Sequence, residues 1–287
     1  MNIKTLLLLL LFGSSYCFAD VLHLEDSCTR FSFDKKTGAL RGIFSKAAGV
    51  SPIKAGNKCG IFELSFKKTG YIRSGEVKKI TAENCRLFSQ KITLQGKKKI
   101  LTQSYLLPDQ KSRFTCRMIF DEKQYSSWQI VSIENNSGME IFEVAFPVIG
   151  GIDLAGKEML FRGGMYYVLP DPFKYRVLND VFPSRAPFPV LDIYKEDGSC
   201  GLFLIDLDRT RQRTMLSSRS SGRKIFFNKT VKISNGKKYQ PENRILVSTH
   251  TGQWHTAGAI YRDFLASGKN HVQHPEWLEN CHGGSAC

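Results

Sequence analysis

Alternating apolar and polar residues dominate the chain between residues 29 and 250. In the run 29–34, Phe31 and Phe33 alternate with polar neighbours, and a similar run at 39–44 follows the turn sequence Lys35-Lys36-Thr37-Gly38. A period of two is typical of a strand with one buried face. Gly38 can adopt the positive φ that a tight turn requires. These residues therefore predict a β-hairpin.

Further alternating runs continue to residue 249. We expect strands at 61–67, 76–81, 85–95, 98–106, 112–121, 126–135, 139–148, 188–195, 200–207, 212–218, 223–234 and 239–249. So many strands with little helix between them are stable as antiparallel sheets packed face to face. The predicted fold class is mainly β, a large two-sheet antiparallel supersandwich with one C-terminal helix.

The predicted helix covers residues 253–267. Its apolar side chains recur every three or four residues, which gives one apolar stripe, and Gly268 is a suitable stop. Residues 150–187 instead break the strand rhythm with glycines, prolines and aromatic residues. A loop of this length is usually functional or covers the core as a crossover, and both interpretations stay open. If it is functional, its aromatic and acidic residues would bind a sugar: Tyr166, Tyr167, Asp171 and Tyr175.

The first nineteen residues have the three parts of a secretory signal peptide. Lys4 supplies the positive charge, Leu6 to Phe12 is an unbroken apolar run, and Ala19 offers a cleavage site. The run is too short to span a bilayer, which takes about 20 apolar residues. Tyr16 before Cys17 disfavours a lipid anchor, since lipidation needs a small residue there. We therefore expect a periplasmic or extracellular protein with no integral membrane segment after cleavage.

The formal net charge of +15 favours anionic partners through long-range attraction. An exported protein rarely meets nucleic acid, so the expected anionic partners are sulfated or uronic polysaccharides, or the cell envelope. The alternative is that the lysines and arginines are solvated at strand ends and turns. The eight cysteines have wide, irregular spacings. Cys116 and Cys200 lie in apolar strand patterns and are expected to be small core residues.

Several segments together resemble the β-sandwich that precedes the catalytic barrel of secreted glycoside-hydrolase-like bacterial proteins, a galactose mutarotase-like domain. They are, in order, Phe33-Asp34 to Ile43, Trp128 to Pro147, Gly198 to Asp208, and His250 to Arg262 followed by Pro275-Glu276-Trp277-Leu278. The resemblance covers roughly residues 29–278. It implies a signal peptide at 1–19, the supersandwich at 20–250, and a linker helix with the truncated start of a barrel region at 251–287.

In those proteins the barrel carries the paired catalytic carboxylates, and this chain ends about ten residues after Trp277. The resemblance therefore implies a carbohydrate-associated, non-catalytic sandwich, with a barrel on a separate chain as one partner. The alternative is an enzyme in its own right, a sugar epimerase or a polysaccharide lyase. True mutarotases transfer protons with a histidine and a glutamate, and the sequence does not reveal that pair.

Four further residues are candidates for ligand binding. Asp206 and Asp208 stand two apart at a strand end, so both point to one face; they are sugar ligands or solvated strand-end carboxylates. His250 and Trp254 form a polar and aromatic cluster at the start of the helix, either a ligand site or a structural junction. Catalytic residues are not identified, and no metal site or cofactor is expected, because Cys281-His282 lacks a second ligand pair at zinc spacing.

Overall fold

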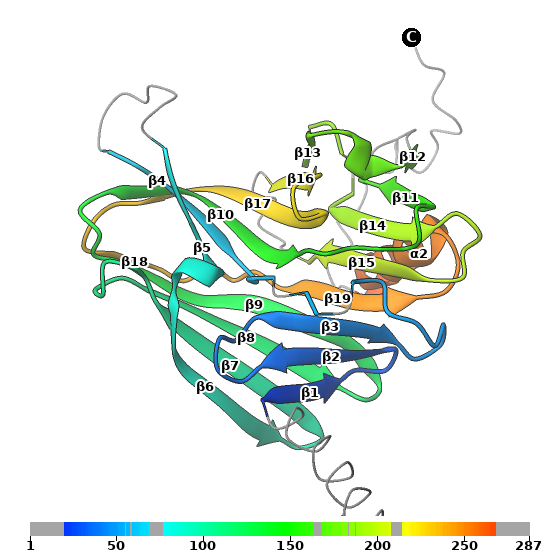
Figure 1. Ribbon diagram of the computed structural model, residues 1–287, viewed down its shortest axis with the longest axis horizontal. Coiled ribbons are helices and arrows are strands. Elements are labelled where there is room, and N and C mark those ends of the chain that lie inside the picture. The colour runs from blue at the N-terminus through cyan, green and yellow to red at the C-terminus, as the bar shows by residue number, and fades with distance from the viewer. Residues whose placement is uncertain are drawn as a thin grey trace, which may run out of the picture.

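The computed structural model describes residues 20–267 except 55, 58, 69–76, 164–167, 183, 187 and 208–213. The described strands form antiparallel sheets, and helix α2 (Trp254–Ser267) lies at one side of them (Figure 1). The predicted class, mainly β with one C-terminal helix, is confirmed.

A three-stranded sheet begins the fold, in the order β1-β2-β3. Its strands are β1 (Val21–Glu25), β2 (Thr29–Asp34) and β3 (Leu40–Ser45). The predicted hairpin is β2 and β3, with Gly38 at φ +70° in the turn. β1 was not among the predicted strands. The structure therefore has a third, smaller sheet in addition to the two that were predicted.

A six-stranded sheet has the order β13-β16-β17-β10-β4-β5. Every described pairing in it is antiparallel. Its strands are β4 (Glu63–Lys67), β5 (Lys78–Thr81), β10 (Glu140–Ile149), β13 (Val177–Phe182), β16 (Thr214–Arg219) and β17 (Lys224–Ile233).

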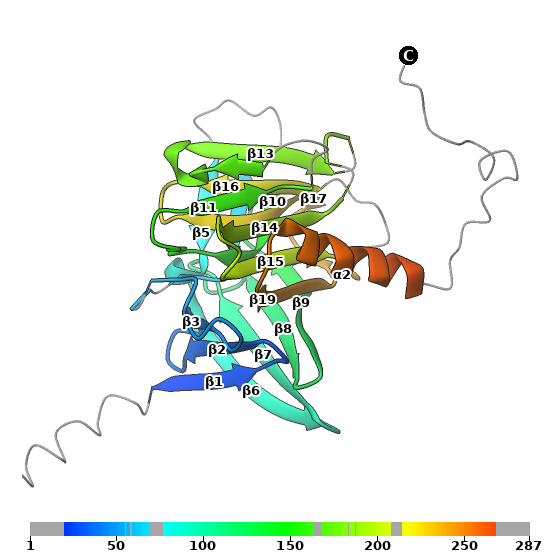
Figure 2. The ribbon, with the colours of Figure 1, turned by 90° about the vertical axis from the view of Figure 1, so that its right-hand side faces the viewer.

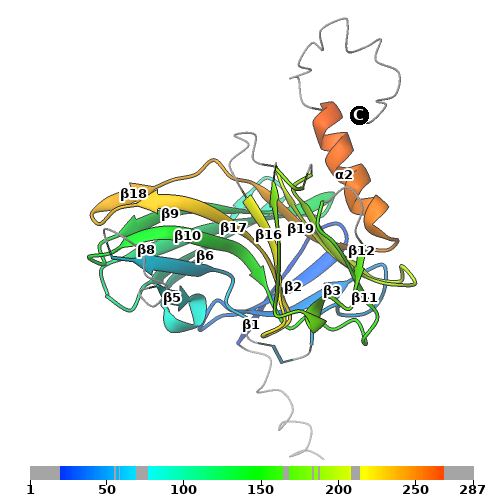
Figure 3. The same ribbon diagram turned by 90° about the horizontal axis from the view of Figure 1, so that it is seen from above.

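The ten-stranded sheet has the order β12-β11-β14-β15-β19-β9-β8-β7-β6, with β18 paired to β9. Seen from above, the sheets curve round each other as two layers (Figure 3). The strands are β6 (Arg86–Gln95), β7 (Lys98–Leu106), β8 (Arg113–Asp121), β9 (Gln124–Asn135), β11 (Glu158–Phe161), β12 (Val168–Pro170), β14 (Val190–Lys195), β15 (Gly201–Asp206), β18 (Lys237–Tyr239) and β19 (Ile245–His250).

The main core fills the space between the inner faces of the sheets. Phe62 of the segment before β4 stacks on Phe114 of β8, with ring centroids 3.9 Å apart. Phe31 of β2 packs on Phe120 and Trp128, with centroids at 5.5 and 5.7 Å. Aromatic contacts therefore hold the small sheet to the inner face of β8 and β9. Such ring pairs stabilise the fold beyond the effect of the apolar area that they bury.

A second apolar cluster lies on the opposite, outer face of the ten-stranded sheet. It includes Val190, Tyr194 and Phe203 of β14 and β15, and Ala257 of α2. Figure 2 shows α2 lying across this part of the sheet. Alternation along β14 and β15 sends one set of side chains to the core and the other to the helix, so these strands are buried on both faces.

Residues 150–187 are more regular than predicted. Three short strands, β11, β12 and β13, and the 3-10 helix η3 (Pro172–Lys174) lie in this segment, so part of it crosses between sheets. The predicted strand 239–249 divides into β18 and β19. Pro241 lies between them and has no N–H to donate to a sheet ladder, which explains the interruption.

The described cysteines Cys28, Cys59, Cys85, Cys116 and Cys200 are free. Cys116 and Cys200 belong to the main core, as predicted, and burial raises the pKa of the Cys200 thiol to about 11. Among the described residues, no helix combines the length and the apolar character needed to cross a bilayer.

Candidate functional site

A buried histidine–carboxylate pair lies on the outer face of the ten-stranded sheet. Nε2 of His250, the last residue of β19, is 2.9 Å from Oδ1 of Asp192 on β14. Asp192 is fully buried and His250 is 6% exposed. Nδ1 of His250 is 3.2 Å from the carbonyl oxygen of Thr251, which can only accept, so Nδ1 carries a proton. The pair therefore shares a further proton between Nε2 and the carboxyl group.

Gly201 on β15 makes this pair possible. β15 lies between β14 and β19, and Gly201 is directly opposite His250 in the register. A Cβ atom at Gly201 would be 2.2 Å from Nε2 of His250. The imidazole thus crosses the backbone of β15 at the one point where no side chain stands, and reaches Asp192 on the next strand.

Aromatic side chains lie beside the pair, and Phe161 of β11 is opposite Asp192 in the strand register. Phe203 of β15 lies 6.0 Å from the imidazole, between centroids. At the start of α2, Trp254 stacks on Phe161 of β11 with centroids 4.7 Å apart, and on His255 at 3.9 Å. This apolar enclosure leaves Oδ2 of Asp192 buried without a hydrogen-bond partner among the described residues. The site combines a proton-sharing pair with an aromatic border.

The environment raises the pKa values of both members of this pair. Burial raises the pKa of Asp192 above its ordinary value. Burial of the imidazole acts against protonation, but the hydrogen bond and charge of Asp192 prevail and raise the pKa of His250 above 6.5. On the same strand, burial followed by the charge of Asp192 raises the pKa of Tyr194 to about 12.

These shifts predict a pH-dependent stability. The folded chain binds the shared proton more tightly than the unfolded chain does, so the stabilisation by the pair is complete below the unfolded pKa of His250 and is lost as the pH rises through its raised folded pKa. The control is the double variant D192N/H250N, which keeps polar groups at both positions but cannot titrate. The free energy of unfolding, measured by urea denaturation, should fall more for the natural chain than for the control from about pH 6 to about pH 9. Equal slopes would contradict the shared proton.

Two of the predicted ligand residues lie in this region: His250 belongs to the pair, and Trp254 stacks on Phe161, which is opposite Asp192 in the strand register. Asp206 lies elsewhere, in a buried ion pair with Lys229 of β17 at 2.8 Å. Asp171 precedes η3 in the left-handed conformation, with φ 48°, and Tyr175 is 41% exposed just after η3. Tyr166, Tyr167 and Asp208 lie outside the described residues. Ligand binding by these eight residues stays a prediction.

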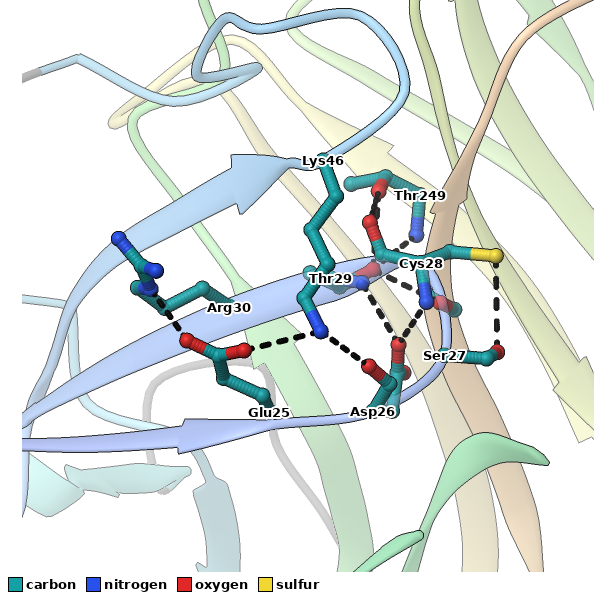
Figure 4. Close-up of polar contacts among 9 residues, drawn as sticks. Glu25, Asp26, Ser27, Cys28, Thr29, Arg30, Lys46 and Thr249 are labelled. Atoms are coloured by element: carbon teal, nitrogen blue, oxygen red, sulfur yellow. Dashed lines mark hydrogen bonds and ion pairs between the residues drawn. The ribbon is translucent and has the colours of Figure 1, made fainter. Parts of the chain in front are cut away.

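Sequence reasoning missed Asp192, because a single aspartate in a run of strand residues gives no signal of its own. It also missed Asp26, which is fully buried at the turn between β1 and β2 (Figure 4). Asp26 accepts hydrogen bonds from the backbone of Cys28 and Thr29 through Oδ1, and from Ser126 N through Oδ2 at 2.8 Å. Thr29 in turn is hydrogen-bonded to Ser248 and Thr249.

The Asp26 network has a structural role. It joins the β1–β2 turn to β9 and β19, whose backbones would otherwise leave polar groups unpaired at this junction. Lys46 closes the turn from outside, donating to the Asp26 carbonyl oxygen at 2.7 Å and pairing with Glu25 at 2.9 Å (Figure 4). Within the described part of the chain, no cluster of three histidine, cysteine or acidic residues could hold a metal ion.

No protein-family model and no curated protein sequence matches this chain. Solved structures do. An α-N-acetylgalactosaminidase from Bifidobacterium bifidum matches 85% of this chain with a TM-score of 0.57 at 9% identity. An α-galactosidase from Geobacillus stearothermophilus, in complex with stachyose, matches 86% with a TM-score of 0.56 at 9% identity. A galactose mutarotase-like protein from Lactobacillus casei matches 80% with a TM-score of 0.50 at 11% identity.

The extent of these matches differs. The chain spans 39% and 43% of the two glycosidases, and 31% of an α-mannosidase from Enterococcus faecalis, but 100% of the mutarotase-like protein. The matched part of the glycosidases is their N-terminal domain. At these identities the similarity concerns the fold, and the chain has the β-sandwich fold of the galactose mutarotase-like proteins and of the N-terminal domains of glycoside hydrolases.

Proposed function

We propose that this chain is an exported, carbohydrate-binding β-sandwich that works as a non-catalytic domain beside a glycoside hydrolase. The observation that carries the proposal is the shared fold. A domain of this fold stands beside further chain in the matched glycosidases, which extend well past the region that this sandwich covers. Export is supported by the signal-like residues 1–19, and it would place the protein where polysaccharides are found.

The non-catalytic assignment is supported by the Asp192–His250 pair. Acid–base catalysis requires a titratable group within hydrogen-bond reach of the substrate. Asp192 is fully buried and His250 nearly so, with Phe203 6.0 Å from the imidazole. A sugar could reach the imidazole only if the side chains that bury it moved away. The pair is accordingly a structural element of the sandwich in this proposal.

A catalytic barrel on a separate chain is the proposed partner. The apolar surface beside α2 supports this, because Leu265 is 53% exposed and Phe188 is 45% exposed. Phe188 lies 6.2 Å from Tyr261 of α2, between centroids, so the exposed residues extend the apolar face of the helix. Contiguous exposed apolar residues are typical of protein–protein contacts.

The alternative function is an enzyme of the epimerase class. The observation that favours it is the Asp192–His250 pair itself, a proton-sharing pair in a fold that a galactose mutarotase-like protein also has. In that case the side chains that bury the pair would have to move to admit the sugar, and replacing His250 would abolish turnover.

A glycan array tests the proposal. The full chain should bind a defined subset of immobilised polysaccharides or oligosaccharides, with α-galactosides included because of the matched glycosidases. Binding should persist in the H250N variant, since the buried pair is not the ligand site in this proposal. Absence of binding to every glycan would contradict a carbohydrate-binding function.

A further inference from the structure

The outer face of the ten-stranded sheet has two halves of different character. α2 packs on the half formed by β14 and β15, and β6, β7, β8 and most of β9 form the other half. At the border, Tyr125 at the start of β9 still packs on Phe203 of the α2 cluster. Along β8 the burial alternates strictly, with Phe114, Cys116 and Met118 inward. Arg113, Thr115 and Arg117 therefore point outward. We call the outward side chains of these four strands the β6–β9 face.

The strand register aligns polar side chains in rows across the β6–β9 face. Lys91 of β6 is opposite Thr102 of β7, Thr102 is opposite Arg117 of β8, and Arg117 is opposite Gln129 of β9. Adjacent strands are about 4.8 Å apart, so this row covers roughly 14 Å. In the neighbouring row the hydroxyls of Ser104 and Thr115 lie 3.1 Å apart. The face thus offers cations flanked by hydroxyl and amide groups.

The charge of this face is not balanced. Its acidic side chains are already engaged, Glu134 with Lys238 at 3.3 Å and Asp121 with Lys98 at 3.8 Å. Among the described residues, no carboxylate forms an ion pair with Lys91, Arg113 or Arg117. Glu134 is opposite Arg113 in the register, but its carboxylate pairs with Lys238. Three cations on one face that form no described ion pair attract a polyanion, and a salt solution screens that attraction.

An aromatic ring borders the same face. The Arg113 guanidinium lies over the ring of Phe88 on β6, 5.0 Å from its centroid, and Phe88 is 54% exposed. Phe88 also lines a hollow of about 490 Å³ at the edge of the sandwich, together with Gln90 and Lys36. An exposed ring beside cations can stack on the apolar C–H face of a sugar while its acidic substituents meet the cations.

We propose that the β6–β9 face binds an anionic polysaccharide, a chain of sulfated or uronic sugars lying across the row from Lys91 to Gln129, with Phe88 as a stacking platform. This inference rests on the proposed carbohydrate-binding function and specifies its ligand class and its site. Lys91, Arg113 and Arg117 bind the sulfate or carboxylate groups. The hydroxyls of Ser104 and Thr115 and the amide of Gln129 bind the sugar hydroxyls.

Dextran sulfate and unmodified dextran are the probes, since they share one backbone and differ in charge. The test variant is K91Q/R117Q. The matched control is K78Q/K79Q, which removes two exposed lysines from β5 at the edge of the other sheet and so changes the net charge equally. Affinity is measured by titration calorimetry on the full chain at two salt concentrations. Near-ultraviolet circular dichroism verifies the fold, and Lys91→Glu alone replaces the double variant if that fails to fold.

The proposal predicts that dextran sulfate binds, and that K91Q/R117Q weakens this binding about tenfold, as expected for two ionic contacts at the surface. K78Q/K79Q should weaken it about twofold or less, and higher salt should weaken it in the natural chain. An equal loss in both variants would show a net-charge effect and overturn the proposal. So would equally tight binding of duplex DNA through Lys91 and Arg117, which would make the face a general polyanion surface.

The failure of this inference can be told apart from failure of the proposed function. If a neutral glycan binds and K91Q/R117Q leaves its affinity unchanged, the β6–β9 assignment is wrong while the carbohydrate-binding function stands. If neither dextran sulfate, polygalacturonate nor any neutral glycan binds, both are wrong.

Discussion

Replacing Gly201 with alanine is expected to lower the free energy of unfolding by about 3 kcal/mol, because an added Cβ displaces the imidazole that neutralises a buried carboxylate. The added atom would stand 2.2 Å from Nε2 of His250, which bonds Oδ1 of Asp192, and Oδ2 has no described hydrogen-bond partner to compensate. Urea denaturation of the natural and G201A chains measures the effect.

The matched control for G201A is the same substitution at Gly258. Gly258 lies inside α2, and an added Cβ there would meet nothing nearer than Trp254, at 3.8 Å. Alanine has a higher helix propensity than glycine, so G258A should raise the free energy of unfolding by about 0.5 kcal/mol. If G201A were as stable as G258A, the Asp192–His250 pair would have no energetic role.

The Trp128→Ala substitution is expected to lower the free energy of unfolding by about 4 kcal/mol, the usual cost of removing a large buried aromatic side chain. The indole is fully buried against Phe31 and Phe33, and its Nε1 donates to Ser126 Oγ at 3.0 Å. Because Phe31 and Phe33 belong to β2, the loss should loosen the three-stranded sheet in particular.

Hydrogen exchange on the W128A chain locates this effect. Protection of β1–β3 amides should fall more than protection of β16 and β17, which lie in the other sheet. The control is Leu94→Ala on β6, where the side chain is 74% exposed and the change should stay within about 0.5 kcal/mol. A uniform loss of protection over all sheets would contradict the role of Trp128 as the anchor of β2.

Much of the sandwich could be predicted because its strands are long and each buries one face. β8 is the clearest example, since every second residue from Phe114 to Phe120 is buried. The short strands β11 and β12 could not be predicted in the same way. Three or four residues between glycines and prolines are too few to show a period, and the pairing with β14 that orders β11 is a long-range contact.

Part of the candidate site could be predicted from local sequence, and part of it depends on long-range pairing. His250 and Trp254 are close in sequence to the predicted helix start, so their proximity followed from local structure. Asp192 is 58 residues away from His250 and meets it only through the register of β14, β15 and β19 with a glycine between them. Register across three strands depends on the whole sheet, and the sequence of any one strand does not show it.

The central claim is carbohydrate binding without turnover. Its most direct test is one experiment with the glycan that the chain binds on the array. Proton NMR of the purified chain with that glycan should show saturable binding, while the number of reducing ends and the anomeric ratio of a matching monosaccharide stay at the rates of the protein-free control. Turnover above the control that is abolished in H250N would contradict the account, and would make the Asp192–His250 pair the centre of an enzyme.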